Sequence, residues 1–391
     1  MKILIASDCY KYNMNGVTTS ILALCSGFRR RGHEVKVLSL SYRHLSFQEG
    51  DDYYIRSFPA LIYPDLRISF ARRDPLLEEL KSWKPDIIHV HTDGSSNRFA
   101  SQIMKHTGVP LIKTCHTNYD YYMFGRFCSF PPLKAISGFT GSRLYRHAAI
   151  VTVPSHKALS FPFLHSLHDR LIVIPNGIEL DRYRNRFSAR ERHAFRLSLG
   201  IDDHTRVLII LSRLSKEKNI RKLISYFPDI LKKTPDVKFL IVGDGPDRKH
   251  LEKQAAKLQL KEYMIFTGRI PAEDVWQYYS AADIYVADPT FEVHSMSYME
   301  AMASGLPLLC RADDSLEGVL EHGQNGLIWN CKEQFVNLVC KLQSDDALRA
   351  SMAGHAIQKA EGFSNDTYAS AMLHVYETAT NIDQFQHPRF L

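Results

Sequence analysis

The chain of 391 residues has 45% hydrophobic and 23% charged residues, which is typical of a globular protein long enough for two α/β domains. No stretch approaches the roughly 18 apolar residues of a membrane span, and the N-terminus enters a strand pattern directly, so we expect neither an anchor nor a signal peptide. The seven cysteines are scattered and never spaced Cys-x-x-Cys. This argues against a disulfide framework or zinc site and favours reduced thiols in a cytoplasm.

Charge is unevenly distributed along the chain. Residues 1–195 contain 27 basic and 16 acidic residues, a net charge of +11, whereas the remainder contains 22 and 26, a net charge of −4. A basic half can indicate nucleic acid, an anionic membrane surface or an anionic substrate. Because no nucleic-acid recognition module is recognisable, we expect no nucleic-acid partner. An ordinary solvated basic surface is the alternative.

The first half alternates short apolar runs with amphipathic segments, which is the pattern of βαβ units. Strands are predicted at 2–7, 34–40, 86–90, 110–115, 149–153 and 171–174, and helices at 17–31, 75–83 and 97–106. Pro-Asn-Gly at 175–177 then marks a turn. We therefore predict an N-terminal Rossmann-like domain over residues 1–178.

The second half begins with a polar, arginine-rich connector at 179–200, in which one short helix is predicted. Strands follow at 206–211, 237–242, 263–267, 283–287 and 306–310. A second Rossmann-like domain is predicted over 179–362, and a last helix within 363–391 is predicted to cross back to the first domain. The fold class is thus α/β, with two doubly wound domains facing a cleft. Such a cleft suits a two-substrate reaction that excludes water.

The most informative motif lies at 291–307, where a strand gives way to a helix. Glu292 and Glu300 stand eight residues apart, so one carboxylate can hold one part of an elongated ligand while the second holds another. Free backbone N–H groups at the helix start suit an anionic ligand. The ligand-binding residues predicted at this helix start are Ser295, Met296 and Ser297. The alternative is a capped surface helix with ordinary acidic residues.

Two cations, Arg213 and Lys218, follow the first strand of the second domain at five-residue spacing. At the mouth of a parallel sheet they can clamp a diphosphate, Arg through its fork and Lys as a point charge. Gly243, in the glycine-rich turn at 242–246, is positioned to let a nucleotide approach. A solvated basic loop and an ordinary α/β turn are the alternatives.

Gly16 and His116 are the candidates in the first domain. Gly16 opens the first helix after the first strand, where a glycine allows close approach of a phosphate or sugar. His116 follows the strand at 110–115 and could hydrogen-bond a substrate hydroxyl or steady developing charge. A helix-start glycine without a ligand and a satisfied structural histidine are the alternatives. His89 and His91 share a strand face, but no carboxylate cluster completes a site, so no metal is expected.

Aromatic and basic residues crowd the segment after His116. Together with Arg29 to Arg31 and Arg72 to Arg73, they suit an anionic bilayer or an acceptor with an apolar tail. The alternative is that these rings fill the core beneath a long loop. The membrane- or acceptor-facing candidates are Tyr119, Tyr122, Phe124, Arg126, Lys134 and Arg143.

Taken together, these motifs resemble retaining glycosyltransferases of the two-Rossmann GT-B type, in the large family 4 that includes sucrose and lipid glycosyl transferases. The resemblance implies that Glu292 lies near the donor sugar, that Glu300 holds the ribose, and that Arg213 and Lys218 clamp the diphosphate. It also implies a front-face path in which the leaving phosphate takes the acceptor proton. The turn at 174–178 is a further hallmark of the family.

Gly16 and His116 correspond to the glycine and the histidine of that family's active site. The segments 113–122 and 15–21 are similar to bacterial diacylglycerol glucosyltransferases. This implies transfer of a hexose, glucose from UDP-glucose, to a membrane lipid such as 1,2-diacylglycerol, without a metal, at the inner face of the cell membrane. Ser295 stands where the family commonly has glycine, which leaves the identity of the sugar open.

Three alternatives to this function remain at the level of the sequence. The same donor chemistry could serve a polysaccharide or a polyprenyl-linked acceptor. The chain could instead be a catalytically silent nucleotide-binding protein, although the full set of motif residues argues against it. Sugar epimerisation on the same fold would need acid–base residues that the sequence does not identify.

Overall fold

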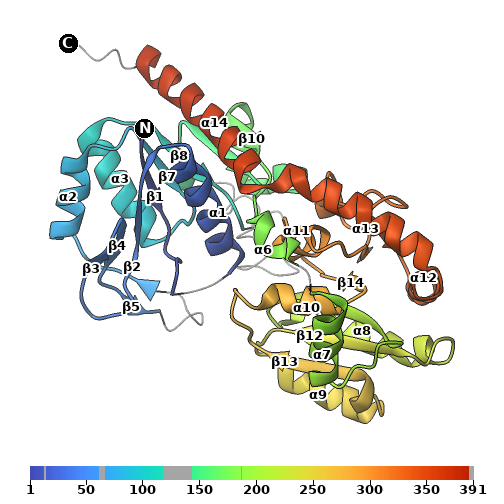
Figure 1. Cartoon of the computed structure of the whole chain (residues 1–391). Coiled ribbons are helices and arrows are strands. Elements are labelled where there is room, and N and C mark those ends of the chain that lie inside the picture. Colours follow the sequence, from blue (N-terminus) through green and yellow to red (C-terminus); the bar gives the residue numbers. More distant parts are fainter. Residues whose placement is uncertain (13–14, 61–66, 118–142, 186, 387–391) are drawn as a thin grey trace. The chain divides into compact units, whose positions relative to one another are not determined.

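The computed structural model describes residues 1–12, 15–60, 67–117, 143–185 and 187–386. The chain divides into two compact units (Figure 1). The N-terminal unit comprises residues 1–178 and the chain from Asn365 onwards, and the C-terminal unit comprises residues 179–364. Among the described residues, none of the helices combines the length and the apolar character needed to cross a membrane.

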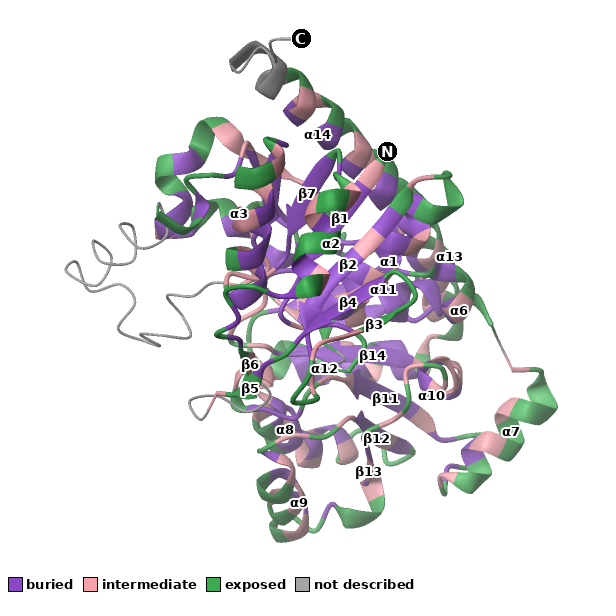
Figure 2. Ribbon diagram, turned by 90° about the vertical axis from the view of Figure 1, so that its left-hand side faces the viewer, coloured by how far each residue is buried: buried purple, intermediate pink, exposed green. Residues whose placement is uncertain are grey.

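The N-terminal unit is built on an eight-stranded sheet in the order β10-β9-β8-β7-β1-β2-β4-β3, in which only the β3–β4 pair is antiparallel. Most of its strands are buried on both faces, as the purple ribbons of β1, β2 and β7 show (Figure 2). A separate two-stranded sheet pairs β5 with β6. The strands are β1 (Lys2–Ala6), β2 (Glu34–Leu40), β3 (Phe47–Glu49), β4 (Asp52–Ile55), β5 (Phe58–Pro59), β6 (Arg67–Ile68), β7 (Ile87–Val90), β8 (Leu111–Thr114), β9 (Ile150–Val153) and β10 (Leu171–Val173).

Helices α1 and α2 of this unit start at side chains that satisfy free backbone N–H groups. Asn15 caps α1, its Oδ1 accepting from the backbone N of Thr18 at 3.0 Å, and Asp74 caps α2 in the same way. The α-helices are α1 (Gly16–Arg30), α2 (Pro75–Trp83), α3 (Ser95–Thr107) and α14 (Asn365–Gln386), and two 3-10 helices, η2 (His156–Ser160) and η3 (Pro162–Arg170), lie between β9 and β10.

Helix α14, the last of the chain, contributes to the core of the N-terminal unit. Its Met372 and Tyr376 are fully buried in one cluster with Phe28 of α1. Gly27 permits the close approach of the two helices, because a Cβ there would lie 2.6 Å from the carbonyl oxygen of Asn365. The chain therefore returns to its first helix for the completion of this core.

Two arginines at the end of α1 also fix α14. Arg31 donates to Asp366 Oδ1 at 2.8 Å and to the backbone oxygen of Asp366 at 2.9 Å, and Arg30 donates to the same carboxylate at 3.1 Å. Arg29 donates to the backbone oxygen of Val35. The basic run at 29–31, which suggested a membrane contact, is thus engaged within the unit.

The C-terminal unit has a six-stranded, fully parallel sheet in the order β13-β12-β11-β14-β15-β16. Its strands are β11 (Arg206–Leu211), β12 (Val237–Val242), β13 (Met264–Gly268), β14 (Ile284–Ala287), β15 (Leu308–Arg311) and β16 (Gly326–Trp329). After the connector, the α-helices of this unit are α8 (Ile220–Leu231), α9 (Arg248–Lys257), α10 (Val275–Ala281), α11 (Met296–Ala303), α12 (Lys332–Ser344) and α13 (Asp346–Ala360). Parallel strands bring their carboxyl ends to one edge, where ligands bind in open α/β sheets.

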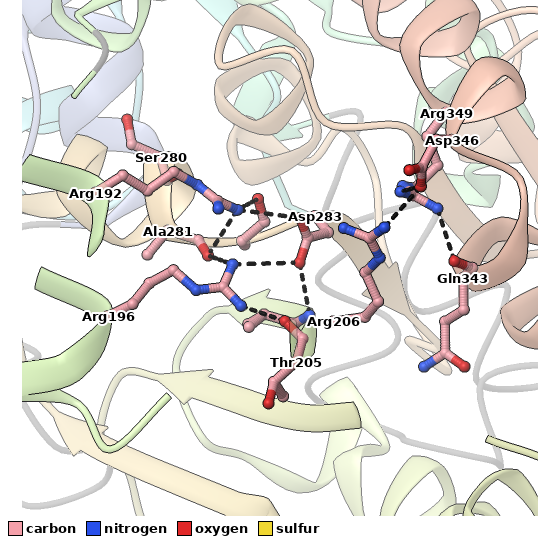
Figure 3. A network of polar contacts seen from close by, with 12 residues as sticks. Arg192, Arg196, Thr205, Arg206, Ser280, Ala281, Asp283, Gln343, Asp346 and Arg349 are labelled. Carbon is pink, nitrogen blue, oxygen red and sulfur yellow. Dashed lines mark hydrogen bonds and ion pairs between the residues drawn. The ribbon is translucent and has the colours of Figure 1, made fainter. Parts of the chain in front are cut away.

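The connector forms two helices, α6 (Leu180–Arg184) and α7 (Ala189–Ser198), so the prediction of a single short helix is wrong. Figure 3 shows how α7 is held: Arg192 donates to Asp283 at 3.0 Å, and the almost fully buried Arg196 lies 3.5 Å from the same carboxylate. Asp283 also accepts from the backbone N of Val207, at 2.8 Å. The connector is therefore an integral part of the C-terminal unit.

Candidate active site

The C-terminal unit brings together two of the predicted catalytic residues. Lys218 ends the 3-10 helix η4 (Lys216–Lys218) after β11, and its Nζ lies 2.8 Å from Oε2 of Glu292, in the loop between β14 and α11. The backbone N of Thr290 donates to the carbonyl oxygen of Glu217 at 2.8 Å, which fastens the two loops to each other. A cation and a carboxylate thus meet beyond the ends of two adjacent strands.

The ion pair favours the charged form of Lys218. Burial opposes the charge on the amine, but Glu292 and, to a smaller extent, Glu217 together more than offset this, and the pKa of Lys218 lies above its ordinary value. The Lys218 and Glu292 side chains keep 25% and 14% of their surfaces exposed. The pair is therefore a charged, partly open group, as a ligand contact requires.

Helix α11 begins beside this loop. Within the described chain, Ser295 at its N-cap makes no side-chain capping bond; its Oγ instead lies 3.0 Å from Oγ of Ser297. The hydroxyl of Ser297 lies 2.7 Å from that of Tyr285. Met296 and Ser297 are half-buried. Because no side chain caps the first turn, its backbone N–H groups suit an anionic ligand.

Glu300, the second carboxylate of the motif, lies further along α11 and is 6% exposed. Its Oε1 accepts from the hydroxyl of Tyr183 at 3.0 Å, and its Oε2 accepts from that of Tyr279 at 2.9 Å. Burial raises the pKa of Glu300 above its ordinary value, although the two hydrogen bonds act in the opposite direction. The predicted contact with a ribose would have to use the remaining lone pairs of a carboxylate that two tyrosines already orient.

Arg213 and Gly243 lie at the same edge of the sheet. Arg213 is exposed, two residues beyond β11. Gly243, directly after β12, has φ = +130°, and a Cβ there would collide with the carbonyl oxygen of Ser212. The backbone N of Leu214 donates to the oxygen of Asp244 at 2.9 Å. Close packing of the two loops thus accounts for Gly243, and its contact with a nucleotide stays a prediction.

Sequence reasoning missed Asp288, which is fully buried one residue after β14. It accepts from Asn219 at 2.8 Å, and Lys222 and Arg311 lie at 3.3 and 3.5 Å. Burial raises its pKa, while these two cations oppose the shift. Asp288 ties the ends of β14 and β15 to the start of α8. Its place directly after a buried strand was the signal that could have revealed it.

The N-terminal unit contains Gly16 and His116, the two site candidates of the first domain. Gly16 is the exposed first residue of α1, next to the cap Asn15. His116 is half-buried two residues after β8, and its Nε2 lies 2.9 Å from Nδ1 of the buried His91. Gly16 and His116 thus belong to the N-terminal unit, whereas Lys218 and Glu292 belong to the C-terminal unit.

Asp8 is a second residue that sequence reasoning did not single out as a site residue. It accepts from the backbone N of Gly94 at 3.0 Å and of Ser96 at 2.8 Å, at the start of α3. Gly94 is required there, because a Cβ would collide with the Asp8 carboxylate. Burial raises the pKa of Asp8, against the effect of its hydrogen bonds. This carboxylate fixes the loop after β1 to the neighbouring helix.

Most of the predicted membrane or acceptor residues lie outside the described residues: Tyr119, Tyr122, Phe124, Arg126 and Lys134. Arg143 is described and exposed. Across the described ranges, no group of three or more His, Cys, Asp and Glu side chains is arranged to hold a metal ion.

Comparisons with known proteins match both units. The family model Glycosyltransferase Family 4 matches residues 14–182, and Glycosyl transferases group 1 matches residues 191–359. The chain is 28% identical over 389 residues to the alpha-monoglucosyldiacylglycerol synthase of Acholeplasma laidlawii, covering 96% of each chain. It is 29% identical over 337 residues to the synthase of the same name from Streptococcus pneumoniae, covering 84% of this chain and 76% of that one.

Solved structures agree on the fold. A crystal structure of Anabaena Alr3699/HepE in complex with UDP and glucose matches with a TM-score of 0.75 at 20% identity, covering 97% of this chain and all of that one. Two Rossmann-like units with parallel sheets therefore define a GT-B glycosyltransferase, as the sequence predicted. The protein is an enzyme of the hexosyltransferase type. The chain belongs to glycosyltransferase family 4.

Proposed function

We propose that the enzyme transfers a hexose, glucose from UDP-glucose, to a membrane lipid such as 1,2-diacylglycerol, with retention of anomeric configuration. The observation that carries this proposal is the pairing of Lys218 with Glu292 beside the uncapped first turn of α11. A cation, a carboxylate and backbone N–H groups at one sheet edge suit a sugar bound through a diphosphate. The two alpha-monoglucosyldiacylglycerol synthases among the relatives support glucose and diacylglycerol.

In the proposed reaction, stabilisation of negative charge makes the largest contribution to the rate. Arg213, Lys218 and the start of α11 stabilise the negative charge that develops on the departing UDP, and removing one such group typically lowers the rate by about 10²–10³. The acceptor oxygen bonds to the anomeric carbon on the face from which the phosphate leaves. The acceptor proton passes to the leaving phosphate oxygen as the bond from that oxygen to the anomeric carbon breaks. No sugar–enzyme bond forms on this path.

The two glutamates act on different parts of the donor in this proposal. Glu292 contacts the sugar, and Glu300 holds the ribose in the orientation that Tyr183 and Tyr279 impose on its carboxylate. Since Arg213 and Lys218 can meet the charge of the diphosphate, we propose that no metal is required.

An apolar surface of the N-terminal unit supports a membrane partner. This hairpin surface consists of four exposed side chains: Leu45, Phe58, Ile68 and Phe70. Phe58 and Ile68 are cross-strand partners in the β5–β6 sheet, and His44, next to Leu45, has its ring 6.4 Å from that of Phe58. Phe70 is 73% exposed. Exposed apolar side chains on such neighbouring segments suit an interface with lipid or protein.

The chain segments that carry the hairpin surface are basic. Its described segments, 43–46, 56–60 and 67–73, contain no aspartate or glutamate. The arginines in these segments are Arg43, Arg56, Arg67, Arg72 and Arg73. Apolar side chains among basic ones suit the interface of an anionic bilayer, because the rings enter the headgroup region while the arginines meet lipid phosphates. We therefore propose a peripheral location on the inner face of the cell membrane.

Release of UDP from UDP-glucose tests the donor and the acceptor together. Turnover should appear in anionic mixed micelles that contain diacylglycerol and should be absent from micelles without it, with Lys218→Met as the inactive control. Equal release in both would contradict the lipid acceptor and favour a soluble one. Binding of UDP without turnover on lipid, polysaccharide or polyprenyl-linked acceptors would favour a silent nucleotide-binding protein.

Vesicle sedimentation tests the hairpin surface separately. Complete transfer of a phenylalanine out of water contributes about 1.5–3 kcal/mol. Because Phe58 and Phe70 are 46% and 73% exposed, their double substitution by serine should weaken binding to phosphatidylglycerol vesicles by about 20- to 400-fold. Leu197→Ser removes a similarly exposed side chain, 51% exposed on α7, and should have no effect. Unchanged sedimentation of the double variant would show that this surface does not enter the bilayer.

A further inference from the structure

Two neighbouring residues of the loop after β11 are each held by a carboxylate of the loop after β14. Nζ of Lys218 lies 2.8 Å from Oε2 of Glu292. Nδ2 of Asn219 donates to Oδ2 of Asp288, also at 2.8 Å. The Lys218 and Glu292 side chains are partly exposed, whereas Asp288 is fully buried. The candidate catalytic pair is therefore accompanied by a second, buried contact one residue along the chain.

Asn219 has an unusual backbone conformation and an unusual side-chain partner for the residue that precedes a helix. Its φ of +54° lies in the left-handed region, which asparagine tolerates better than most residues. It is the N-cap of α8, but within the described chain its side chain makes no capping bond, in contrast to Asn15 at α1. The amide donates to Asp288 instead, so Asn219 fastens the loop after β11 to the loop after β14.

Asp288 provides a fixed point for this contact. It directly follows β14, which lies between β11 and β15 in the sheet. Lys222 of α8 and Arg311 of β15 lie 3.3 and 3.5 Å from its carboxylate. A buried carboxylate with these partners, in addition to Asn219, has little freedom to turn, so it determines where the amide of Asn219 can lie.

The position of Asn219 in turn limits that of Lys218. Adjacent Cα atoms are about 3.8 Å apart across a trans peptide bond, so the backbone of Lys218 moves with that of Asn219. The four-carbon stem of a lysine is flexible and does not by itself direct the amine to one place. Fixing the backbone at Asn219 therefore limits the positions that Nζ of Lys218 can reach, and Glu292 lies at one of them.

We propose that Asp288 is a positioning residue: through Asn219, it holds Lys218 where the amine meets Glu292 and the diphosphate of the donor. Asp288 is 0% exposed, so it acts through its neighbours and does not contact the ligand. The role in catalysis rests on the proposed function, whereas the effect on the pair of Lys218 and Glu292 concerns the enzyme without ligand. The two effects can thus be measured separately.

A double-mutant cycle on the full chain tests the effect on the ion pair. Thermal unfolding of Lys218→Met, Glu292→Gln and their combination gives the coupling between these residues. The same cycle is repeated in Asn219→Gly, because glycine readily adopts a φ of +54° and only the side-chain amide is lost. The coupling should be present in the unsubstituted enzyme and largely lost in Asn219→Gly.

Two outcomes of this cycle would overturn the proposal. One is a coupling that is unchanged in Asn219→Gly. This result is expected if the contact between Asp288 and Asn219 only stabilises the fold, because all proteins of the cycle would then lose stability equally. The other is the absence of coupling in both backgrounds, since Lys218 and Glu292 would then not act as a pair.

Steady-state release of UDP tests the effect on catalysis. Asp288→Ala and Asn219→Gly should each lower kcat by about 10- to 100-fold, because a misplacement of about 1 Å can lower a rate about 10²-fold. The double variant should be no slower than the slower single variant, since both substitutions remove the same hydrogen bond. Asp288→Asn keeps an oxygen that accepts from Asn219 and should retain more of kcat than Asp288→Ala. Effects that multiply in the double variant, or an unchanged kcat in both single variants, would overturn the proposal.

Gln259→Gly is the matched control variant. Gln259 also has a positive φ, +60°, and is exposed after α9 in the same unit. Its replacement should leave kcat and the coupling between Lys218 and Glu292 unchanged. If the unsubstituted enzyme releases no UDP, the proposed function fails, and the coupling still decides the role of Asp288. If it releases UDP and both single variants keep full kcat, only the role of Asp288 fails.

Discussion

Removing the charges of Lys218 and Glu292 singly and together tests whether this pair is catalytic or only structural. Lys218→Met removes the amine and retains most of the stem, and Glu292→Gln keeps the shape of the carboxylate without its charge. Breaking a fully buried ion pair costs about 3–5 kcal/mol. Because these side chains keep 25% and 14% exposure, we expect a smaller loss of about 1–3 kcal/mol in the stability of the C-terminal unit.

The catalytic effect should exceed the effect on stability and should appear in kcat. An electrostatic group that contacts the leaving diphosphate is expected to contribute about 10²–10³ in rate, or roughly 2.7–4 kcal/mol. If the pair only supports the loops, each single variant leaves one unpaired charge, and the double variant relieves it. If both residues contact the donor, the double variant is at least as slow as the slower single variant.

Steady-state release of UDP, with kcat and KM measured separately for the three variants, distinguishes these outcomes. Recovery of the double variant to within tenfold of the unsubstituted enzyme would refute the catalytic assignment. Lys332 and Asp229 form a matched control pair in the same unit, with Nζ and Oδ2 at 2.5 Å and side chains 42% and 31% exposed. The corresponding substitutions, Lys332→Met and Asp229→Asn, should leave kcat unchanged.

Two further predictions concern the surroundings of the donor site. Tyr279→Phe should destabilise the enzyme by about 1.5–3 kcal/mol at pH 8 and by less near pH 4.5, because the hydrogen bond from Tyr279 favours the charged form of Glu300. Because burial raises the pKa of Glu300, the free energy of unfolding decreases as pH rises through that pKa. This decrease should be steeper in the variant, which lacks the hydrogen bond from Tyr279. Equal losses of stability at both pH values would contradict this prediction. Tyr278→Phe is the control variant. Gly243→Ala should lower the free energy of unfolding by more than about 2 kcal/mol, because its Cβ would collide with the carbonyl oxygen of Ser212. Gly318 also has a positive φ, +75°, but open space around it, so Gly318→Ala should cost about 1 kcal/mol. Thermal unfolding measures both losses, and equal losses would exclude the collision at Gly243.

The longer elements of the fold were predictable because their hydrophobic patterns extend over enough residues to be recognised. The predicted strands at 34–40, 206–211 and 237–242 have the same bounds in the structure. The pair β3 and β4 was missed, because three- and four-residue strands offer too few positions for alternation to appear. The sheet partner of such a strand, and not its own composition, decides its conformation.

The candidate site was predictable where chemistry and chain position coincide. Lys218 and Glu292 each follow a predicted strand, so a parallel sheet brings them to one edge, and the structure pairs them. The partners of Glu300 were not predictable, because Tyr183 and Tyr279 lie 117 and 21 residues away in sequence. Sequence spacing describes neighbours on one element, whereas such hydrogen bonds depend on tertiary packing.

The arginine clusters show the same limit of sequence reasoning. Their different environments change the interpretation of the basic N-terminal half. From sequence alone, the run at 29–31 and the pair at 72–73 are equivalent clusters of arginine. In the structure, Arg30 and Arg31 bind Asp366 and so fasten α14 to α1, whereas Arg72 and Arg73 are exposed close in sequence to Phe70. A net charge of +11 therefore overstates the charge available to a membrane, since part of it stabilises the fold. An exposed arginine next to an exposed apolar side chain is the more informative sign of a bilayer contact, because both can face the same lipid headgroups.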